Sequence, residues 1–256
     1  MARLGFARRL ASADRCLVGT WVKIPALEPV EILADAGFDF IVIDQEHAPL
    51  TFEFAYQATV VAQGAGLSVL VRVPDRSGSH LQRLLDVGVD GILVPRVTSV
   101  GEASAAVRQM LFSPRGDRGL GSTSRAGRWG ATPRDEYLRF GDEEVMRAVQ
   151  LEERAAIDSV EEILDVPGLN GVFLGMGDLQ LSSGLPQSDP QIQTLVDRLL
   201  SAAQARGVPA GTAVQTAAQA RQAADRGYRY VMVSNDTSLL RSAAASVVAD
   251  LRSRPA

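Results

Sequence analysis

Short apolar runs alternate with helix-like segments eight times along this chain, and this alternation limits its possible folds more than any other feature. The runs have the length and composition of strands that are buried on both faces. The predicted strands are Leu17–Val22, Phe40–Ile43, Leu67–Val73, Gly91–Val94, Met146–Leu151, Gly171–Leu174, Val208–Val214 and Tyr228–Ser234. The intervening segments have helical spacing, and several end at a glycine, which is common just past a helix. The predicted helices are Pro29–Ala36, Phe52–Ala65, His80–Val87, Ser99–Leu111, Ala155–Leu164, Ile192–Ala205, Ala217–Arg226 and Ser238–Leu251.

Eight strand–helix units without a second composition block predict a single α/β domain, a closed (β/α)8 barrel of the TIM type. We expect one domain over residues 1–256, with the barrel core at 17–236, an N-terminal helix within 1–16 and a C-terminal helix within 237–256. The N-terminal helix, Leu4–Ala11, is amphipathic and is expected to lie on the body of the protein. A doubly wound open sheet is the competing fold, but the chain has neither a dinucleotide-binding fingerprint nor a P-loop.

The composition excludes several classes of function. A formal charge of -4 argues against a general nucleic-acid binder, which needs a basic face. No apolar stretch approaches about 18 residues, so no membrane span is expected. The single cysteine, Cys16, excludes an intramolecular disulfide framework, and no signal peptide is recognisable. These features predict a cytoplasmic protein.

One loop differs from the rest of the chain. Residues 112–133 are rich in Gly, Arg and Ser, and loops of this length inside a compact domain are usually functional or disordered. The composition favours an anion-binding or subunit-bridging loop over a flexible insertion.

Polar side chains gather where the predicted strands end, and in a barrel these ends meet at one mouth. They are Trp21, Asp44, Glu46, His47, Arg72, Gln150, Glu152, Asp178, Thr212 and Asn235. Two carboxylates on neighbouring strands, Glu152 and Asp178, suit a hard divalent cation such as Mg²⁺ or Mn²⁺ better than Zn²⁺. Two alternatives stay open. Glu152 could instead form a buried salt bridge with Arg72, and His47 could merely cap a turn.

Four motifs carry a family resemblance. They are Ile43-Asp-Gln-Glu-His-Ala-Pro49, Val71-Arg-Val-Pro74, Val149-Gln-Leu-Glu152 and Gly171-Val-Phe-Leu-Gly-Met-Gly-Asp-Leu179. In this order they resemble the HpcH/HpaI aldolase family, class II pyruvate aldolases similar to 2-dehydro-3-deoxyglucarate and 4-hydroxy-2-oxoheptanedioate aldolases and, more distantly, to citrate lyase β. The likeness runs from about Gly19 to Asp236.

The resemblance implies a metal-dependent lyase that reversibly splits a 2-keto-4-hydroxy acid into pyruvate and an aldehyde through a metal-stabilised enolate. It implies that Glu152 and Asp178 hold a divalent cation (Mg²⁺, Mn²⁺ or Co²⁺) and that Arg72 stabilises the enolate oxygen. His47 would handle the proton of the 4-hydroxyl group. The implied substrate-binding residues are Trp21, Arg72, Gln150, Gly175, Met176, Gly177 and Asp178.

Asp86 matches an aspartate that is associated with the histidine in the family. By its position near the end of a predicted helix, however, Asp86 lies far from the mouth of its own barrel, so its role would need a neighbouring subunit. The resemblance also implies a homo-oligomer, a trimer or hexamer. The apolar C-terminal helix is expected to pack on a neighbour, with ordinary cover of its own barrel as the alternative.

The chain departs from the family pattern in two places. Gly175-Met-Gly-Asp178 stands where relatives have Gly-Pro-Ala-Asp or Gly-Pro-Asn-Asp, and Arg96 follows strand four where many relatives are apolar. Arg96 would either select an acidic substrate or pair with a carboxylate.

Alternative functions are oxaloacetate decarboxylation, a malyl- or citramalyl-CoA lyase activity, and a catalytically silent barrel that binds a keto acid. Lys23, the only lysine, leaves a Schiff-base mechanism open.

Overall fold

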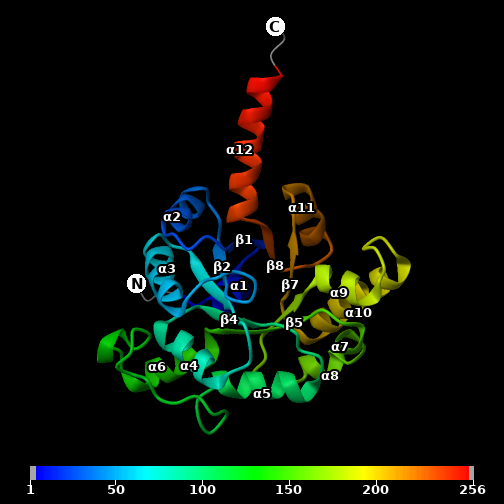
Figure 1. Cartoon of the computed structure of the whole chain (residues 1–256). Coiled ribbons are helices and arrows are strands. Elements are labelled where there is room, and N and C mark those ends of the chain that lie inside the picture. The colour runs from blue at the N-terminus through cyan, green and yellow to red at the C-terminus, as the bar shows by residue number, and fades with distance from the viewer. Residues whose placement is uncertain (1–3, 254–256) are drawn as a thin grey trace.

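The eight predicted strands form one closed parallel barrel in the computed structural model, which describes residues 4–253 (Figure 1). The strands follow one another around the barrel in chain order, and β1 closes it by pairing with β8. They are β1 (Leu17–Val22), β2 (Phe40–Asp44), β3 (Ser68–Arg72), β4 (Gly91–Val94), β5 (Met146–Leu151), β6 (Gly171–Leu174), β7 (Ala210–Val214) and β8 (Tyr230–Asn235). The predicted (β/α)8 fold is confirmed.

Helices cover the outside of the barrel (Figure 1). They are α1 (Phe6–Ser12), α2 (Glu28–Asp35), α3 (Phe52–Gly64), α4 (Gly78–Val87), α5 (Val100–Met110), α6 (Arg134–Glu143), α7 (Arg154–Asp158), α8 (Val160–Leu164), α9 (Met176–Ser183), α10 (Pro190–Arg206), α11 (Ala217–Asp225) and α12 (Asp236–Arg252), with a short 3₁₀ turn η1 at Arg128–Gly130. The sequence analysis missed α6 and α9, and the helix predicted at 155–164 is divided into α7 and α8 at Ser159.

Apolar side chains fill two separate regions. One lies between the strands and the outer helices, and the other fills the inside of the barrel. The inner cluster includes Phe6 and Leu10 of α1, so the N-terminal helix closes the amino end of the barrel rather than lying on its surface. The Phe6 ring lies 4.9 Å from the Phe40 ring and 6.1 Å from the Tyr230 ring. Residues 1–3, which the predicted N-terminal segment included, lie outside the described part of the chain.

The C-terminal helix α12 does not cover its own barrel. It projects away from it (Figure 1), and Asp236 is its only buried residue within 236–252. Its apolar side chains Leu239, Leu240, Val247, Val248 and Leu251 are all exposed. Ordinary barrel cover, the alternative left open for this helix, is therefore wrong for the single chain. Residues 254–256 lie outside the described range.

The Gly- and Arg-rich segment 112–133 is folded back against α4 and α6. The Arg118 guanidinium is buried, lies 3.2 Å from the Asp86 carboxylate and stacks 4.3 Å from the Phe112 ring centre. Arg125 donates to the Val87 carbonyl at 2.8 Å. The segment is thus anchored and not a loose insertion. No helix within residues 4–253 has the length and apolar character needed to cross a membrane.

Candidate active site

The side chains at the mouth follow from strand alternation. Successive residues of a strand point to opposite faces, so the inward face of β1 carries Leu17 and Trp21, and that of β2 carries Phe40 and Val42. On the same inward face, two residues further on, comes Asp44. Arg72 ends β3 by the same alternation after Leu70. The mouth is therefore lined by polar residues that continue an apolar barrel interior.

Asp44 connects several of these groups. It is fully buried and accepts two hydrogen bonds from the Arg72 guanidinium, at 3.0 and 2.8 Å. Its Oδ1 also accepts from the backbone N–H groups of Glu46 and His47, each at 3.2 Å. The turn after β2 is therefore capped by Asp44 and not by His47. The Arg72 guanidinium also stacks 4.3 Å from the Trp21 ring centre.

The charges around Asp44 hold it ionised. Burial alone would raise its pKa, but the hydrogen bonds and charge of Arg72, followed by those of Lys23, outweigh burial and lower the pKa to about 2. Asp44 therefore stays an anion at any physiological pH and keeps Arg72 in one orientation.

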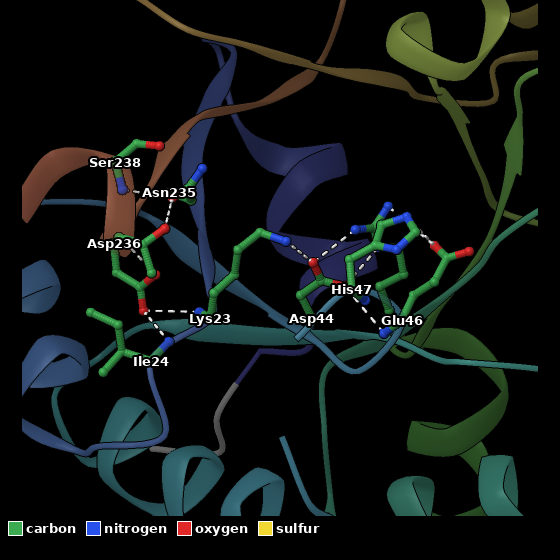
Figure 2. Close-up of polar contacts among 10 residues, drawn as sticks. Lys23, Ile24, Asp44, Glu46, His47, Asn235, Asp236 and Ser238 are labelled. Carbon is green, nitrogen blue, oxygen red and sulfur yellow. Dashed lines mark hydrogen bonds and ion pairs between the residues drawn. The ribbon is translucent and has the colours of Figure 1, made fainter. Parts of the chain in front are cut away.

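Lys23, the only lysine, forms an ion pair with Asp44 from the end of β1 (Figure 2). The loop that carries it is fixed by Asp236 at the start of α12, whose Oδ2 accepts from the backbone N–H groups of Lys23 and Ile24 at 2.9 Å each. The first turn of α12 thereby supports the mouth, although the rest of the helix projects from the barrel.

Glu46 bridges three neighbouring side chains. Its carboxylate is almost fully buried, with Oε2 3.2 Å from the Arg72 Nη1 atom and 3.7 Å from the His47 Nε2 atom. The other oxygen, Oε1, lies 3.2 Å from Nε of Arg96. The His47 ring is 58% exposed, and Figure 2 shows it beside Glu46 at the edge of the mouth. His47 is thus held close to the charged network while it stays open to an incoming molecule.

Glu152 lies next to the Gln150 amide, which donates to its Oε2 atom. Burial, and then the nearby carboxylates of Asp178 and Glu46, raise the Glu152 pKa above its usual value, while the Gln150 amide and the Arg96 backbone N–H oppose the shift. The alternative of a Glu152–Arg72 salt bridge is wrong, because Arg72 pairs with Asp44 and Glu46.

These residues fit a divalent cation. Carboxylate and amide oxygens are the ligands that such ions prefer. The positive charge of a bound cation would also offset the repulsion between two neighbouring carboxylates. The buried Oε1 atom of Gln150 has no hydrogen-bond partner among residues 4–253. Within this range no group of three or more His, Cys, Asp or Glu side chains is arranged to hold a metal. Two protein carboxylates would leave the other coordination positions to substrate and water.

The segment that departs from the family pattern begins helix α9, with Gly175 as N-cap and Asp178 in the first turn. The N–H groups of a first helical turn have no partner within the helix and attract anions. Gly175 leaves no room for a side chain: an added Cβ atom would lie 2.7 Å from Glu152 Oε2 and 3.0 Å from Gln150 Nε2. At Gly177, by contrast, an added Cβ atom would have nothing within 4 Å.

Asp86 and His80 are not part of this network. Asp86, near the end of α4, receives hydrogen bonds from Arg118 and from the Tyr137 hydroxyl, at 3.2 and 3.4 Å, away from His47 of the same chain. Its partnership with a histidine stays a prediction that needs a neighbouring subunit. His80, the other histidine, bonds the Gln45 amide oxygen at 2.9 Å and supports the turn after β2.

The sequence places Asp44 at the mouth but gives it no role, and it offers Lys23 only as a Schiff-base nucleophile. The inward alternation of β1 and β2 was the signal that points to both, since Lys23 and Asp44 lie two residues after the inward Trp21 and Val42.

A closed parallel barrel with an arginine, a histidine and two carboxylates at the carboxyl ends of its strands defines an enzyme of the (β/α)8 class. The family model described as HpcH/HpaI aldolase/citrate lyase matches residues 18–243. The chain belongs to this family and is a carbon–carbon lyase of the class II aldolase type, a class that depends on a divalent cation.

Individual relatives agree. The chain is 34% identical over 247 residues to a 4-hydroxy-2-oxovalerate aldolase of Rhodococcus jostii (strain RHA1), covering 95% of this chain and 94% of that protein. It is also 34% identical over 238 residues to a 2-keto-3-deoxy-L-rhamnonate aldolase of Escherichia coli, covering 91% and 88% of the two chains. A crystal structure of an HpcH/HpaI aldolase/citrate lyase family protein from Burkholderia cenocepacia J2315 superposes with a TM-score of 0.89 at 34% identity, covering 96% of this chain and 98% of the other.

Proposed function

We propose that the protein reversibly cleaves a 2-keto-4-hydroxy acid into pyruvate and an aldehyde at the mouth described above. The observation that carries this proposal is a carboxylate pair, Glu152 and Asp178, in which burial and then the nearby Asp178 charge raise the Glu152 pKa, together with an arginine that Asp44 holds through two hydrogen bonds. A divalent cation held by these two carboxylates would act together with the guanidinium to stabilise a developing oxyanion.

Glu152 and Asp178 would hold the cation (Mg²⁺, Mn²⁺ or Co²⁺) beside Gln150, whose buried amide oxygen has no hydrogen-bond partner among residues 4–253. When bound, the cation supplies Lewis-acid polarisation of the keto group of pyruvate. Gly175 is needed here because any side chain at this position would displace Glu152 and Gln150.

The other groups act on the substrate directly. The Arg72 guanidinium presents a permanent positive charge to the C2 oxygen, where negative charge develops as the carbon–carbon bond breaks. The first-turn N–H groups of α9, at Met176 to Asp178, would bind the pyruvate carboxylate. Trp21, which lies under Arg72, gives the methyl carbon an apolar floor.

His47 would take the proton of the 4-hydroxyl group during cleavage and return it during addition. A histidine suits this step because its imidazole ring can both accept a proton and return it. Asp86 of a neighbouring subunit would orient the ring. Lys23 is committed to Asp44 by an ion pair, and this supports the metal mechanism over a lysine Schiff base.

We further propose a cytoplasmic homo-oligomer, a trimer or hexamer. The exposed apolar side chains of α12 support this proposal, since an isolated projecting helix with such a face gains stability only by packing on another surface.

The reaction is tested by measuring pyruvate release from a panel of 2-keto-4-hydroxy acids and from oxaloacetate. Protein stripped with EDTA is assayed before and after addition of Mg²⁺, Mn²⁺ or Co²⁺. Release from the hydroxy acids should need the cation and should be lost in Glu152→Gln. Glu153→Gln is the matched control, because Glu153 is the exposed next residue and its side chain makes no capping hydrogen bond.

Release from oxaloacetate alone would contradict the aldolase proposal in favour of a decarboxylase. Absence of cation-dependent release from every compound in the panel would overturn the choice of substrate, and CoA esters would then be the class to assay.

A further inference from the structure

Lys23 reaches the mouth from the end of β1 and is the only lysine of the chain (Figure 2). Its side chain is only 22% exposed, although a lysine normally keeps its ammonium group in water. The backbone N–H groups of Lys23 and Ile24 donate to Asp236, so the loop that presents the ammonium group is fixed. Because removing an ammonium group from water is costly, this placement indicates a role for the charge.

Asp44, the partner of Lys23, does not need this lysine to complete its hydrogen bonds. Its Oδ1 atom accepts from Nε of Arg72 and from the backbone N–H groups of Glu46 and His47. Its Oδ2 atom accepts from Nη2 of Arg72 at 2.8 Å and is shared with the Lys23 ammonium group. Arg72 alone would already match the charge of Asp44. Lys23 therefore adds positive charge to a carboxylate that is already paired.

The charges that are joined to Asp44 do not cancel. The ion pairs of lysine and arginine at the mouth, within residues 4–253, connect three cations, Lys23, Arg72 and Arg96, with two anions, Asp44 and Glu46. The two arginines alone would match the two carboxylates, so Lys23 supplies the surplus positive charge of this network. Asp44 and Arg72 are buried, and charges act strongly where water is excluded. The surplus therefore makes the electrostatic potential at the mouth more positive.

The proposed reaction increases the negative charge of the substrate. The keto acid enters with a carboxylate, and a second negative charge develops on the C2 oxygen as the carbon–carbon bond breaks. Arg72 would face this oxygen, but the Asp44 carboxylate that holds Arg72 also offsets its charge. A second cation on the same carboxylate reduces this offset.

We propose that Lys23 is a positioning residue that shares the Asp44 carboxylate with Arg72 and thereby leaves the Arg72 charge available to the enolate oxygen. This inference rests on the proposed function and adds a residue to the same reaction. Lys23 forms no covalent bond with the substrate. Because its effect is electrostatic, an arginine should replace it, and a neutral side chain of similar length should not.

The test compares the binding of pyruvate, which carries one negative charge, with that of oxalate, which carries two and has the planar shape of the enolate. Titration calorimetry with the Mg²⁺-loaded protein gives both affinities. In Lys23→Met, and equally in Lys23→Gln, oxalate affinity should fall about 10- to 30-fold. Pyruvate affinity should fall less than about fivefold, because pyruvate carries half the charge.

Two further variants complete the comparison. Lys23→Arg should stay within about threefold of the wild type for both ligands, because it keeps the charge. Arg198→Met is the control, since it removes one positive charge from α10, where Arg198 pairs with Glu161 on the outer helices. Both affinities should be unchanged in this control.

Equal losses for the two ligands in Lys23→Met, or a loss that Lys23→Arg does not restore, would show that Lys23 only supports the loop and would overturn the inference. Unchanged affinities would overturn it as well. A pyruvate adduct on Lys23 after borohydride reduction would also contradict it, because Lys23 would then be a nucleophile.

Deuterium exchange at the methyl group of pyruvate in the wild-type protein separates the two proposals. If exchange occurs when a cation is added, a negative result in the binding test refutes only the role of Lys23. If no cation supports exchange, the proposed function fails as well.

Discussion

Arg147 and Arg72 are both almost completely buried, but they lie at opposite ends of the barrel and have different partners. Arg147, near the amino end of β5, donates to three backbone carbonyls, those of Gly168, Gly141 and Asp142, at 2.7 to 3.0 Å. Arg72, at the carboxyl end of β3, meets the carboxylates of Asp44 and Glu46 and the face of Trp21.

The difference shows how one fold separates stability from chemistry. At the amino end, neutral carbonyls solvate the Arg147 cation, and burial lowers its pKa to about 10. At the mouth, the charge of Arg72 is balanced by carboxylates. Some hydrogen-bonding capacity there is unused, since the Gln150 amide oxygen has no hydrogen-bond partner among residues 4–253. An anionic substrate and a cation can enter the network around Arg72, because its charged groups can share their partners. The network around Arg147 has no such capacity, because its carbonyl partners are neutral.

The largest effect should come from Arg72→Lys. An ammonium group cannot reproduce the fork that contacts Asp44 and still reaches the substrate, so kcat/KM should fall about 100- to 1,000-fold. Thermal unfolding should change little, since a cation remains beside Asp44. Steady-state kinetics and a melting curve on the same sample check both points. A variant that loses activity only because it is unfolded would contradict the assignment.

The matched variant at the other end is Arg147→Lys. A lysine cannot reach three carbonyls, and the loss of these hydrogen bonds should reduce the free energy of unfolding by about 3 kcal/mol. The folded fraction should keep its kcat. Urea unfolding measures the first quantity, and a kcat that falls as far as in Arg72→Lys would show that the two ends are not functionally separate.

Acid distinguishes the same two networks. The folded-state pKa of Asp44 is lowered to about 2, against about 4 for an unfolded aspartate, so its stabilisation is present above pH 4 and is lost as the pH falls toward 2. This loss should amount to about 2 kcal/mol. Urea unfolding at a series of pH values should show it in the wild type but not in Asp44→Asn. The carbonyl partners of Arg147 do not titrate, so an equal acid effect in both proteins would contradict the contrast.

The two glycines of the Gly175-Met-Gly-Asp178 segment give the smallest pair of effects. Gly175→Ala should lower kcat/KM about tenfold, because the new methyl group displaces Glu152 and Gln150. Gly177→Ala should change it less than about twofold, since the added methyl group meets open space. Cation affinity, measured by titration of the stripped protein, should weaken only in Gly175→Ala. Equal behaviour of the two variants would place the cation elsewhere.

Much of the fold was predictable because it is set by local patterns. Apolar runs such as Phe40–Ile43 and glycines such as Gly88 mark where strands pass and helices end. Helix α9 was missed because its first turn, Met176 to Asp178, has a sequence that favours a loop and is held by its position after β6. Helix α6 was missed because it follows a loop of unusual composition.

The sequence predicts which strand ends carry the site residues, but not which of these side chains form ion pairs with one another. Which carboxylate holds Arg72 depends on the relative rotation of neighbouring strands, and Asp44 is paired with Arg72 by the register of β2 and β3. The partner of Arg96 depends in the same way on a left-handed residue that no local pattern indicates. Asp86 matched a motif, yet its surroundings depend on how the 112–133 segment folds back onto α4.

The central claim is that Glu152 and Asp178 use a cation to stabilise negative charge on the C2 oxygen of pyruvate. It is tested most directly by the exchange of pyruvate methyl protons for deuterium, followed by proton NMR with EDTA-stripped protein before and after addition of Mg²⁺. We expect exchange only after Mg²⁺ is added, its loss in Glu152→Gln, and its retention in Glu153→Gln. Exchange that persists without the cation, or in Glu152→Gln, would contradict the account.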